Sequence, residues 1–315
     1  MQMKDRKSPS RRASSESRYS LMEFMAEFPD DEACLQRLWQ DRYASDGTNA
    51  ECPKCEAVRP FHRYGTKQQR QSWTCTACGH HLHPTAGTIY HKSSTSLHLW
   101  FYAMYLMTST RCGISAKQLE RELGVTYKTA WRIFNKIRSL LDEEIRDLSG
   151  EVETDETLYG GKNKNKHTNK KNPNTHGPQG SDKQPIWGAM ERGGRVVAVV
   201  VPDTKKTTLL PNVIERVLPR STVYSDEAYA YDPLKGLGFQ HKRVHHAAKI
   251  YVEGNAHVNS LEGFWSLLKR GIGGVYHSVS ARHLQSYVSE YAWRYNHRND
   301  RRAQFDTLLV RAARP

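Results

Sequence analysis

The segment His257-Val-Asn-Ser-Leu-Glu-Gly-Phe-Trp-Ser-Leu-Leu-Lys-Arg270 has the spacing of a helix with two different faces. At about 3.6 residues per turn, its apolar side chains fall on one stripe: Leu261, Trp265, Leu268 and Ile272. Polar side chains fall on a second stripe: Asn259, Glu262, Ser266 and Lys269. We expect the apolar face to be buried and the other to present a carboxylate and a cation. A glutamate in such a setting is ordinarily part of a solvated surface. A functional role for Glu262 therefore depends on whether other acids of the chain lie near it.

The segment upstream of this helix has the pattern of an α/β domain. Runs enriched in β-branched residues predict strands over residues 152–154, 186–190, 195–202, 222–225 and 242–245. Gly193-Gly194 marks a hairpin turn, and a helix is expected over 211–218 with Pro211 in its first turn. Hairpins followed by alternating strand and helix indicate a mixed sheet. Residues 160–183 are rich in lysine, asparagine and glycine, which predicts a flexible basic loop.

Three acids are candidates for one pocket in this domain. Asp155 is expected to close the first strand and Asp226 the fourth, while Glu262 lies on the polar stripe of the later helix. Carboxylates of this kind hold Mg²⁺ or Mn²⁺, and two such ions would activate an attacking hydroxyl and stabilise a leaving oxygen at a phosphodiester. Nearby acids are expected to be poorer ligands because they point to the opposite face or sit one pleat from the strand end: Glu156, Glu227 and Glu153.

The composition favours a polyanionic partner. There are 47 Lys and Arg against 33 Asp and Glu, which gives a net charge of +14 and a pI of about 9.5. This excess points to nucleic acid, with a generically basic soluble protein as the alternative. The length of 315 residues suits about two domains. The most apolar stretch, residues 97–107, is too short to span a bilayer, so we expect no membrane partner.

The N-terminal region predicts a tail followed by short helices. Residues 1–19 mix Arg and Lys with Ser and have too little apolar content to fold alone, so we expect a disordered basic tail. Contact with DNA phosphates and a solubilising role are both open for it. The tail lacks the apolar core of a secretory signal, which indicates an intracellular, cytoplasmic protein. Residues 20–43 have the spacing of two helices broken at Pro29.

Two cysteine pairs predict a zinc site. Cys52-Pro-Lys-Cys55 and Cys75-Thr-Ala-Cys78 have nineteen residues between them, a spacing typical of four-cysteine zinc ribbons. Zinc would supply folding free energy that so small an element cannot obtain from a core. Two disulfides are the alternative, which an intracellular location disfavours. Cys34 and Cys112 stand outside the pattern and are expected to be small buried residues.

Residues 114–138 have the pattern of a helix, a turn at Gly124 and a second helix capped by Thr126. This is the helix-turn-helix pattern of DNA-binding proteins, although a helical hairpin that merely packs is also common. The preceding cysteine pairs and the basic second helix favour DNA binding. The side chains that this helix would offer to a groove or its phosphates are Tyr127, Lys128, Arg132 and Lys136.

The C-terminal region adds a core stripe and a basic cluster. Apolar residues recur at helical spacing, which predicts a buried helix face: Leu284, Tyr287, Val288, Tyr291 and Tyr295. Basic residues accompany and follow this stripe: Arg294, His297, Arg298, Arg301 and Arg302. Phosphate contact and a solvated surface are equally open for this cluster.

The order of these parts resembles the zinc-ribbon, ISXO-type bacterial insertion-sequence transposases. The resemblance covers about residues 30–300 and rests on the cysteine pairs, the helix-turn-helix and three blocks: Val152-Glu-Thr-Asp-Glu156, Tyr224-Ser-Asp-Glu-Ala-Tyr229 and the segment 257–271. It implies a ribonuclease-H-like DDE domain with flanking helices. In that domain Asp155 and Asp226 match the two aspartates and Glu262 the final acid, with Mg²⁺ (or Mn²⁺) as cofactor beside the zinc.

The resemblance also bears on other residues of the third block. Lys269 matches the family's following basic residue and, with Arg270 beside it, would bind a phosphate or the DNA of an element end. Some relatives carry asparagine in the third role, so Asn259 is a rival of Glu262 for the metal. His257 is open between contact with DNA or metal-bound water and an ordinary structural role.

The resemblance implies a DNA transposase that recognises terminal inverted repeats and cuts and joins strands without a covalent protein intermediate. Its expected partners are double-stranded DNA, as element ends and target, and further copies of this chain on paired ends; its expected location is the nucleoid. A DNA-binding regulator or a domesticated relative without catalysis is the alternative. The expected domains are a tail over 1–19, a helical lead-in and zinc ribbon over 20–95, a helix-turn-helix region over 96–148 and the catalytic domain over 149–305.

Overall fold

A computed structural model describes residues 19–65, 72–110, 112–161, 168, 183–226, 229–243, 259–298 and 303–314. Outside these residues lie the predicted tail up to residue 18, most of the basic loop, Glu227, His257, Arg301 and Arg302. The chain divides into two compact units, residues 1–137 with 300–315, and residues 138–299. No helix in the described part of the chain has the length and apolarity needed to cross a bilayer.

The first unit begins with two short helices, as the sequence predicts. Helix α1 spans Leu21–Glu27 and helix α2 spans Asp31–Arg42. The Ser20 hydroxyl accepts a hydrogen bond from the Glu23 amide, and Asp30 caps α2 in the same way, so each helix has its own N-terminal cap. The break between them therefore follows from local sequence.

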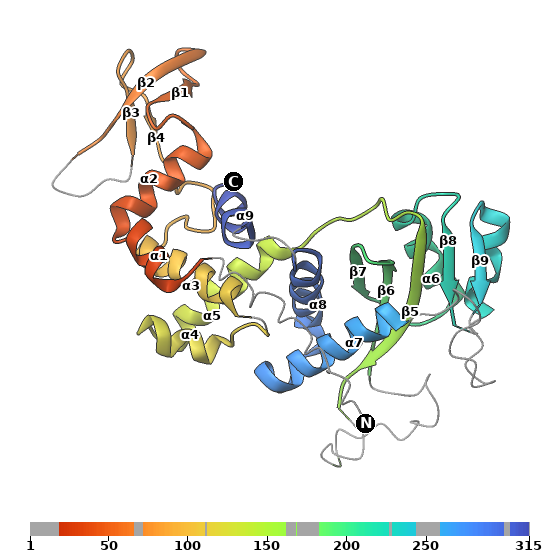
Figure 1. The fold of residues 1–315 in the computed structure, drawn as a ribbon. Coiled ribbons are helices and arrows are strands. Elements are labelled where there is room, and N and C mark those ends of the chain that lie inside the picture. Colours follow the sequence, from red (N-terminus) through yellow and green to blue (C-terminus); the bar gives the residue numbers. More distant parts are fainter. Residues whose placement is uncertain are drawn as a thin grey trace, which may run out of the picture. The chain divides into compact units, whose positions relative to one another are not determined.

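A small antiparallel sheet follows in the order β1-β2-β3-β4, and Figure 1 labels its strands. The strands are β1 (Asn49–Cys52), β2 (Ala57–Arg63), β3 (Trp73–Cys75) and β4 (His81–Leu82). Its apolar side packs on α2, where the rings of Trp39 and Trp73 stack with centroids 4.7 Å apart and an interplanar angle of 2°. This stacking gives the small sheet part of the core that it cannot form alone.

The described residues of this unit form four further helices: α3 (Leu97–Ser109), α4 (Ala116–Leu123), α5 (Tyr127–Arg138) and α9 (Ala303–Ala312). Helix α4 ends at Gly124, whose φ of +62° is in the left-handed region that favours glycine. Thr126 then accepts a hydrogen bond from the Thr129 amide at the start of α5. The predicted helix, turn and helix are therefore present at these residues.

The two cysteines outside the paired motifs differ in exposure. Cys34 is buried in α2, as predicted. The prediction that Cys112 is also buried is wrong, because this residue is exposed in the turn between α3 and α4. A single small residue between two helices carries no periodic signal from which its burial could be read.

The second unit contains a five-stranded mixed sheet in the order β7-β6-β5-β8-β9. Its strands are β5 (Glu151–Tyr159), β6 (Gln184–Glu191), β7 (Val196–Val200), β8 (Thr222–Ser225) and β9 (Gln240–Arg243). Strand β6 is antiparallel to both β5 and β7, whereas β8 is parallel to both β5 and β9. The predicted mixed α/β class is confirmed for this unit. The fifth strand begins two residues earlier than the predicted 242–245, and residues 244 and 245 lie outside the described residues.

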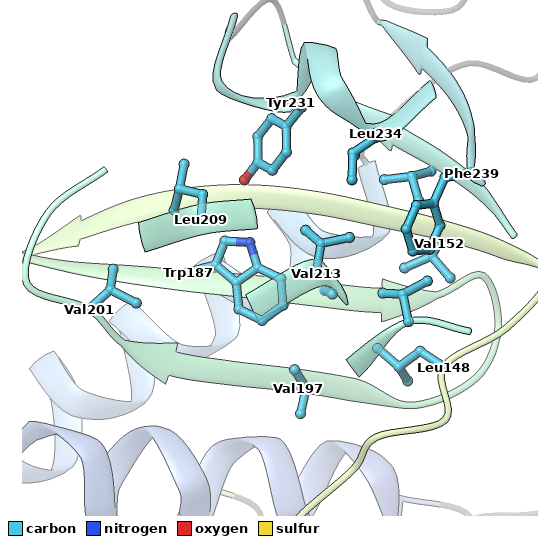
Figure 2. Close-up of a cluster of buried hydrophobic side chains, with 13 residues drawn as sticks. Leu148, Val152, Trp187, Val197, Val201, Leu209, Val213, Tyr231, Leu234 and Phe239 are labelled. Carbon is cyan, nitrogen blue, oxygen red and sulfur yellow. The ribbon is translucent and has the colours of Figure 1, made fainter. Parts of the chain in front are cut away.

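Helical segments flank this sheet: η1 (Ser139–Leu141), α6 (Lys206–Arg216), η5 (Tyr229–Leu237), α7 (Asn259–Gly271), η7 (Ile272–Tyr276) and α8 (Ala281–Asn296). Figure 2 shows Trp187 of β6 beside Leu209 and Val213 of α6 in the buried cluster. The next residue, Gly188, faces Trp265 of α7. Because successive residues of a strand point to opposite faces, α6 and α7 cover opposite sides of the sheet.

The prediction that Asp155 closes the first strand is wrong. Strand β5 continues to Tyr159, because its pairing with β6 extends as far as the Tyr159–Gln184 pair. Asp155 therefore lies within the strand, opposite Gly188 on β6. Asp226, in contrast, directly follows the last residue of β8, as predicted.

The predicted position of Pro211 is also wrong. Helix α6 begins at Lys206, so Pro211 lies inside it and not in its first turn. The helix starts earlier because Asp203 Oδ1 accepts hydrogen bonds from the Lys205 amide at 3.0 Å and the Thr208 hydroxyl at 2.7 Å. Proline cannot donate to the carbonyl of Thr207, but that residue is exposed and water can satisfy it.

Candidate active site and metal centre

Asp155 is held by a contact between β5 and α7. The indole Nε1 of Trp265 donates a hydrogen bond of 3.0 Å to Asp155 Oδ2. The ring reaches this position because Gly188, opposite Asp155 on β6, has no side chain; a Cβ there would lie 2.7 Å from the Trp265 ring. Gly188, the residue paired with Asp155, therefore leaves room for the Trp265 indole, which orients the Asp155 carboxylate.

The three predicted acids interact through space. Burial, together with the carboxylates of Asp226 and Glu262, raises the pKa of Asp155 to about 6. Asp226 is half-buried at the end of β8, whereas Glu262 is exposed in the first turn of α7. Three oxygen donors that repel one another are the donor set that Mg²⁺ and Mn²⁺ prefer, since a divalent cation offsets the repulsion.

The carboxylates do not form a closed metal cage. Within the described residues, the four cysteines are the one group of three or more potential ligands whose ligand atoms all lie within 4.8 Å of one another. The three acids are therefore farther apart than the ligands of a closed site. Such spacing leaves room for water and substrate oxygens, which usually complete the coordination of Mg²⁺.

Helix α7 has the two faces that its sequence predicts. Leu261, Trp265, Leu268 and Ile272 are buried. Asn259, Glu262, Ser266 and Lys269 are exposed. Arg270 is exposed as well, and its Nε donates to the carbonyl of Ser266 at 3.3 Å. The polar face is thus available to a ligand, while the choice between Asn259 and Glu262 as metal ligand stays a prediction.

Two acids set aside on sequence grounds have defined contacts. Glu153 is buried on the face of Asp155 and accepts hydrogen bonds from the amides of Ser260 and Leu261, both at 3.0 Å. Glu156 points to the opposite face, as predicted, where the Tyr231 hydroxyl donates to it. Burial raises the pKa of Glu156 to about 8. The contacts of Glu153 are a feature that sequence reasoning missed, although its place two residues before Asp155 was a usable signal.

The four paired cysteines form a compact sulfur cluster. The Sγ atoms of Cys52 and Cys78 are 3.6 Å apart, and those of Cys55 and Cys75 are 4.0 Å apart. Tetrahedral zinc with Zn–S bonds of about 2.3 Å places its sulfurs about 3.8 Å apart, whereas a disulfide needs about 2.05 Å. The arrangement therefore fits a metal ion and not the alternative of two disulfides.

Backbone contacts of Cys75, in the second pair, favour its thiolate form. Although burial acts in the opposite direction, backbone amides of Cys78 and Ala77 donate to Cys75 and lower its pKa to about 7. A thiolate is the form that binds metal. Hydrogen bonding to Cys78 and burial raise the pKa of Cys55 to about 12, so it is the sulfur spacing that fits a four-cysteine metal site.

Comparison with known proteins identifies the family. A family model described as an ISXO2-like transposase domain matches residues 147–296. A protein of Halobacterium salinarum, described as an uncharacterized protein in transposable element ISH50, is 30% identical over 253 residues, or 77% of this chain and 84% of that protein. The chain belongs to the ISXO2-like transposase family. The matched domain of this family member contains Asp155, Asp226 and Glu262.

Further comparisons find one more curated relative and two distant solved structures. An uncharacterized transposase-like protein of Haemophilus influenzae is 34% identical over 102 residues, or 32% of this transposase and 81% of that protein. A chain of the simian T-cell lymphotropic virus intasome with PP2A regulatory subunit B56 gamma has a TM-score of 0.29 and 14% identity, over 58% of this chain and 65% of that one. A chain of a pre-cleavage Mos1 transpososome has a TM-score of 0.21 and 11% identity, over 68% of this chain and 79% of that one. Structural likenesses this weak establish nothing about this chain.

The predicted DNA-contacting residues of the transposase differ in how free their side chains are. On α5, Tyr127, Lys128 and Arg132 are exposed. Arg132 Nη2 donates to the Thr95 hydroxyl at 3.0 Å. Lys136 is half-buried and its Nζ donates to the Ile89 carbonyl at 3.0 Å. Lys136 would have to release this contact to bind a phosphate.

The predicted basic cluster of the transposase is broken up in the structure. Arg294 is buried, and its Nη2 lies 2.8 Å from Glu290 Oε1. Glu290 also binds Arg138, with 2.7 Å between Nη2 and Oε2. His297 pairs with Glu143 at 2.9 Å. The expectation that Arg294 meets phosphate or solvent is wrong, because a buried carboxylate one helical turn away holds it in the core.

Proposed function

We propose that this chain is a DNA transposase that binds the terminal repeats of its element and uses a divalent metal ion to cut and join DNA strands. The observation that supports the proposal is that the charges of Asp226, which follows the parallel neighbour of β5, and Glu262, on α7, both raise the pKa of Asp155. The mixed sheet supports the ribonuclease-H-like fold that the family resemblance implies.

Asp155, Asp226 and Glu262 would hold Mg²⁺ or Mn²⁺. When bound, such an ion activates the attacking hydroxyl and stabilises the leaving oxygen of a phosphodiester. The chain's own contribution is orientation: Trp265 fixes one carboxylate oxygen of Asp155, and the buried stripe of α7 holds Glu262 beside the sheet. Lys269 and Arg270, exposed on the same helix, would contact the phosphates of the DNA end.

The other proposed DNA contacts lie in the first unit. We propose that α4 and α5 act as a helix-turn-helix in which the exposed Tyr127, Lys128 and Arg132 meet a groove or its backbone. The four-cysteine cluster would hold zinc and stabilise the ribbon. The net charge of +14 supports a nucleic-acid partner. Because strand transfer joins paired ends, the active form would contain more than one copy of the chain.

Cleavage of an end duplex separates this function from that of a DNA-binding regulator. The purified chain is incubated with a terminal-repeat duplex, with and without Mg²⁺. The proposal expects binding in both conditions and nicked or joined strands only with Mg²⁺. Binding without any strand cleavage in Mg²⁺ or Mn²⁺ would favour the regulator instead.

A further inference from the structure

We propose that Glu153 is a positioning residue that fixes helix α7, and with it Glu262, against the strand that carries Asp155. The inference rests on the proposed function of Glu262 and Asp155, but the contacts that carry it are independent of that function. Glu153 itself is fully buried, and its carboxylate accepts a hydrogen bond in the first turn of the helix.

The carboxylate of Glu153 accepts hydrogen bonds from the donors at the start of α7. Its Oε2 accepts from the amides of Ser260 and Leu261, both at 3.0 Å, and its Oε1 accepts from the Ser260 hydroxyl at 3.1 Å. First-turn amides have no acceptor within their own helix, and the helix dipole favours an anion there. Glu153 therefore acts as the N-terminal cap of α7, although it belongs to a strand far away in the sequence.

A cation secures the same carboxylate from the other side. Arg192 Nε lies 3.1 Å from Glu153 Oε1, and the guanidinium stacks over the Tyr224 ring with 4.0 Å to its centroid. A buried charge is stable only when it is paired and hydrogen-bonded. The Glu153 carboxylate is thus held on one side by the first-turn donors of α7 and on the other by Arg192.

Two attachments to β5 bracket Glu262. Glu153 binds the amide of Leu261, the residue directly before Glu262, and Asp155 accepts the indole hydrogen bond of Trp265 one turn later. Glu153 and Asp155 are two residues apart and so point to the same face of the strand. The turn of α7 that carries Glu262 is therefore tied at both ends to one short piece of β5.

Glu151 offers a matched control on the same strand. Glu151 Oε2 lies 3.3 Å from Arg192 Nη1, and the Tyr224 hydroxyl donates to its Oε1 at 2.7 Å. Both acids thus share the partner Arg192. Among the described residues, the hydrogen bonds and ion pairs of the Glu151 side chain go to Arg192 and Tyr224 and not to α7. A change at Glu151 perturbs the charge network without removing the cap.

The test compares full-length Glu153→Gln with Glu151→Gln and wild type, using two readouts. Hydrogen exchange of the Ser260 and Leu261 amides in metal-free protein reports the position of α7. Titration with Mn²⁺, followed by its electron paramagnetic resonance signal, reports the affinity of the acidic site. We expect faster exchange at both amides and about tenfold weaker Mn²⁺ binding in Glu153→Gln, with Glu151→Gln like wild type.

Wild-type exchange at α7 or wild-type Mn²⁺ affinity in Glu153→Gln would overturn the proposal. Ser260→Ala, which removes only the hydroxyl contact, should shift both readouts less and in the same direction; it decides the question if Glu153→Gln fails to fold. Cleavage of a terminal-repeat duplex by wild type is measured alongside. If wild type binds Mn²⁺ but does not cleave, the proposed function fails while the two readouts still judge the role of Glu153.

Discussion

The indole Nε1 of Trp265 lies 3.0 Å from Oδ2 of Asp155 and donates a hydrogen bond to it. The contact joins the middle of α7 to the middle of β5. A carboxylate whose pKa is raised to about 6 by burial, by Asp226 and by Glu262 thereby has a side-chain donor beside the backbone amide of Glu156. The candidate site is thus organised by a neutral aromatic residue as well as by its acids.

Trp265→Phe should destabilise the protein more at pH 8 than at pH 5. Loss of a donor to a buried charged group costs about 1–3 kcal/mol, and Asp155 is charged mainly above its pKa of about 6. The smaller ring also leaves a cavity, whose cost is the same at both pH values. Urea unfolding without added Mg²⁺ measures the loss in free energy of unfolding at each pH. Equal losses at pH 5 and pH 8 would show that the hydrogen bond contributes nothing.

Asp155→Asn should stabilise the metal-free protein at neutral pH by up to about 2–3 kcal/mol. The pKa of Asp155 is higher in the folded than in the unfolded chain, so wild type loses stability as pH rises from about 4 to about 6, and the amide does not. The advantage of the variant should vanish below pH 4. Added Mg²⁺ should stabilise wild type and leave Asp155→Asn unchanged. Thermal unfolding across this pH range checks both, and a variant less stable than wild type at pH 7 would contradict the account.

Wild type should carry about one zinc ion per chain, measured by elemental analysis of purified protein. Cys75→Ser should lose the zinc and unfold the small sheet, because the metal supplies folding free energy there. Cys112→Ser is the matched control, since this exposed cysteine lies outside the sulfur cluster and its replacement should keep the zinc. Folded wild-type protein without metal would refute the zinc assignment.

Glu262→Gln should abolish metal-dependent cleavage, whereas Asn259→Ala should retain it. The carboxylate of Glu262 is one of the charges that raise the pKa of Asp155, which favours it over the neutral Asn259 as the metal ligand. Both side chains are exposed on α7, so neither change should alter stability by more than about 0.5 kcal/mol. Cleavage assays with a terminal-repeat duplex distinguish them. Loss of activity in Asn259→Ala with activity kept in Glu262→Gln would reverse the assignment.

Local patterns were sufficient for much of the second unit. The strand over Thr222–Ser225 and the two faces of α7 follow from side-chain periodicity, which is a property of neighbouring residues. The end of β5 was not predictable in this way, because the pairing with Gln184 across a long intervening segment extends it past Asp155. Strand length is set by the partner strand as much as by the strand's own sequence.

The supporting contacts of the site were beyond sequence reasoning for a related reason. Glu153 caps a helix whose first residues are 107 positions away, and Arg294 is drawn into the core by Glu290. An isolated charged residue predicts exposure, since burial needs a partner that only the fold supplies. The sequence was enough to predict the three candidate acids, whereas the residues that hold their surroundings in place could be identified only from the structure.

The central claim is tested most directly by strand transfer with Asp226→Ala. Wild type and variant are mixed with a labelled terminal-repeat duplex, target DNA and Mg²⁺, and end binding is measured separately by gel shift. The account predicts unchanged end binding and complete loss of cleavage and strand transfer in the variant, because Asp226 would no longer hold the metal ion beside Asp155. Strand transfer by Asp226→Ala at the wild-type rate would contradict it.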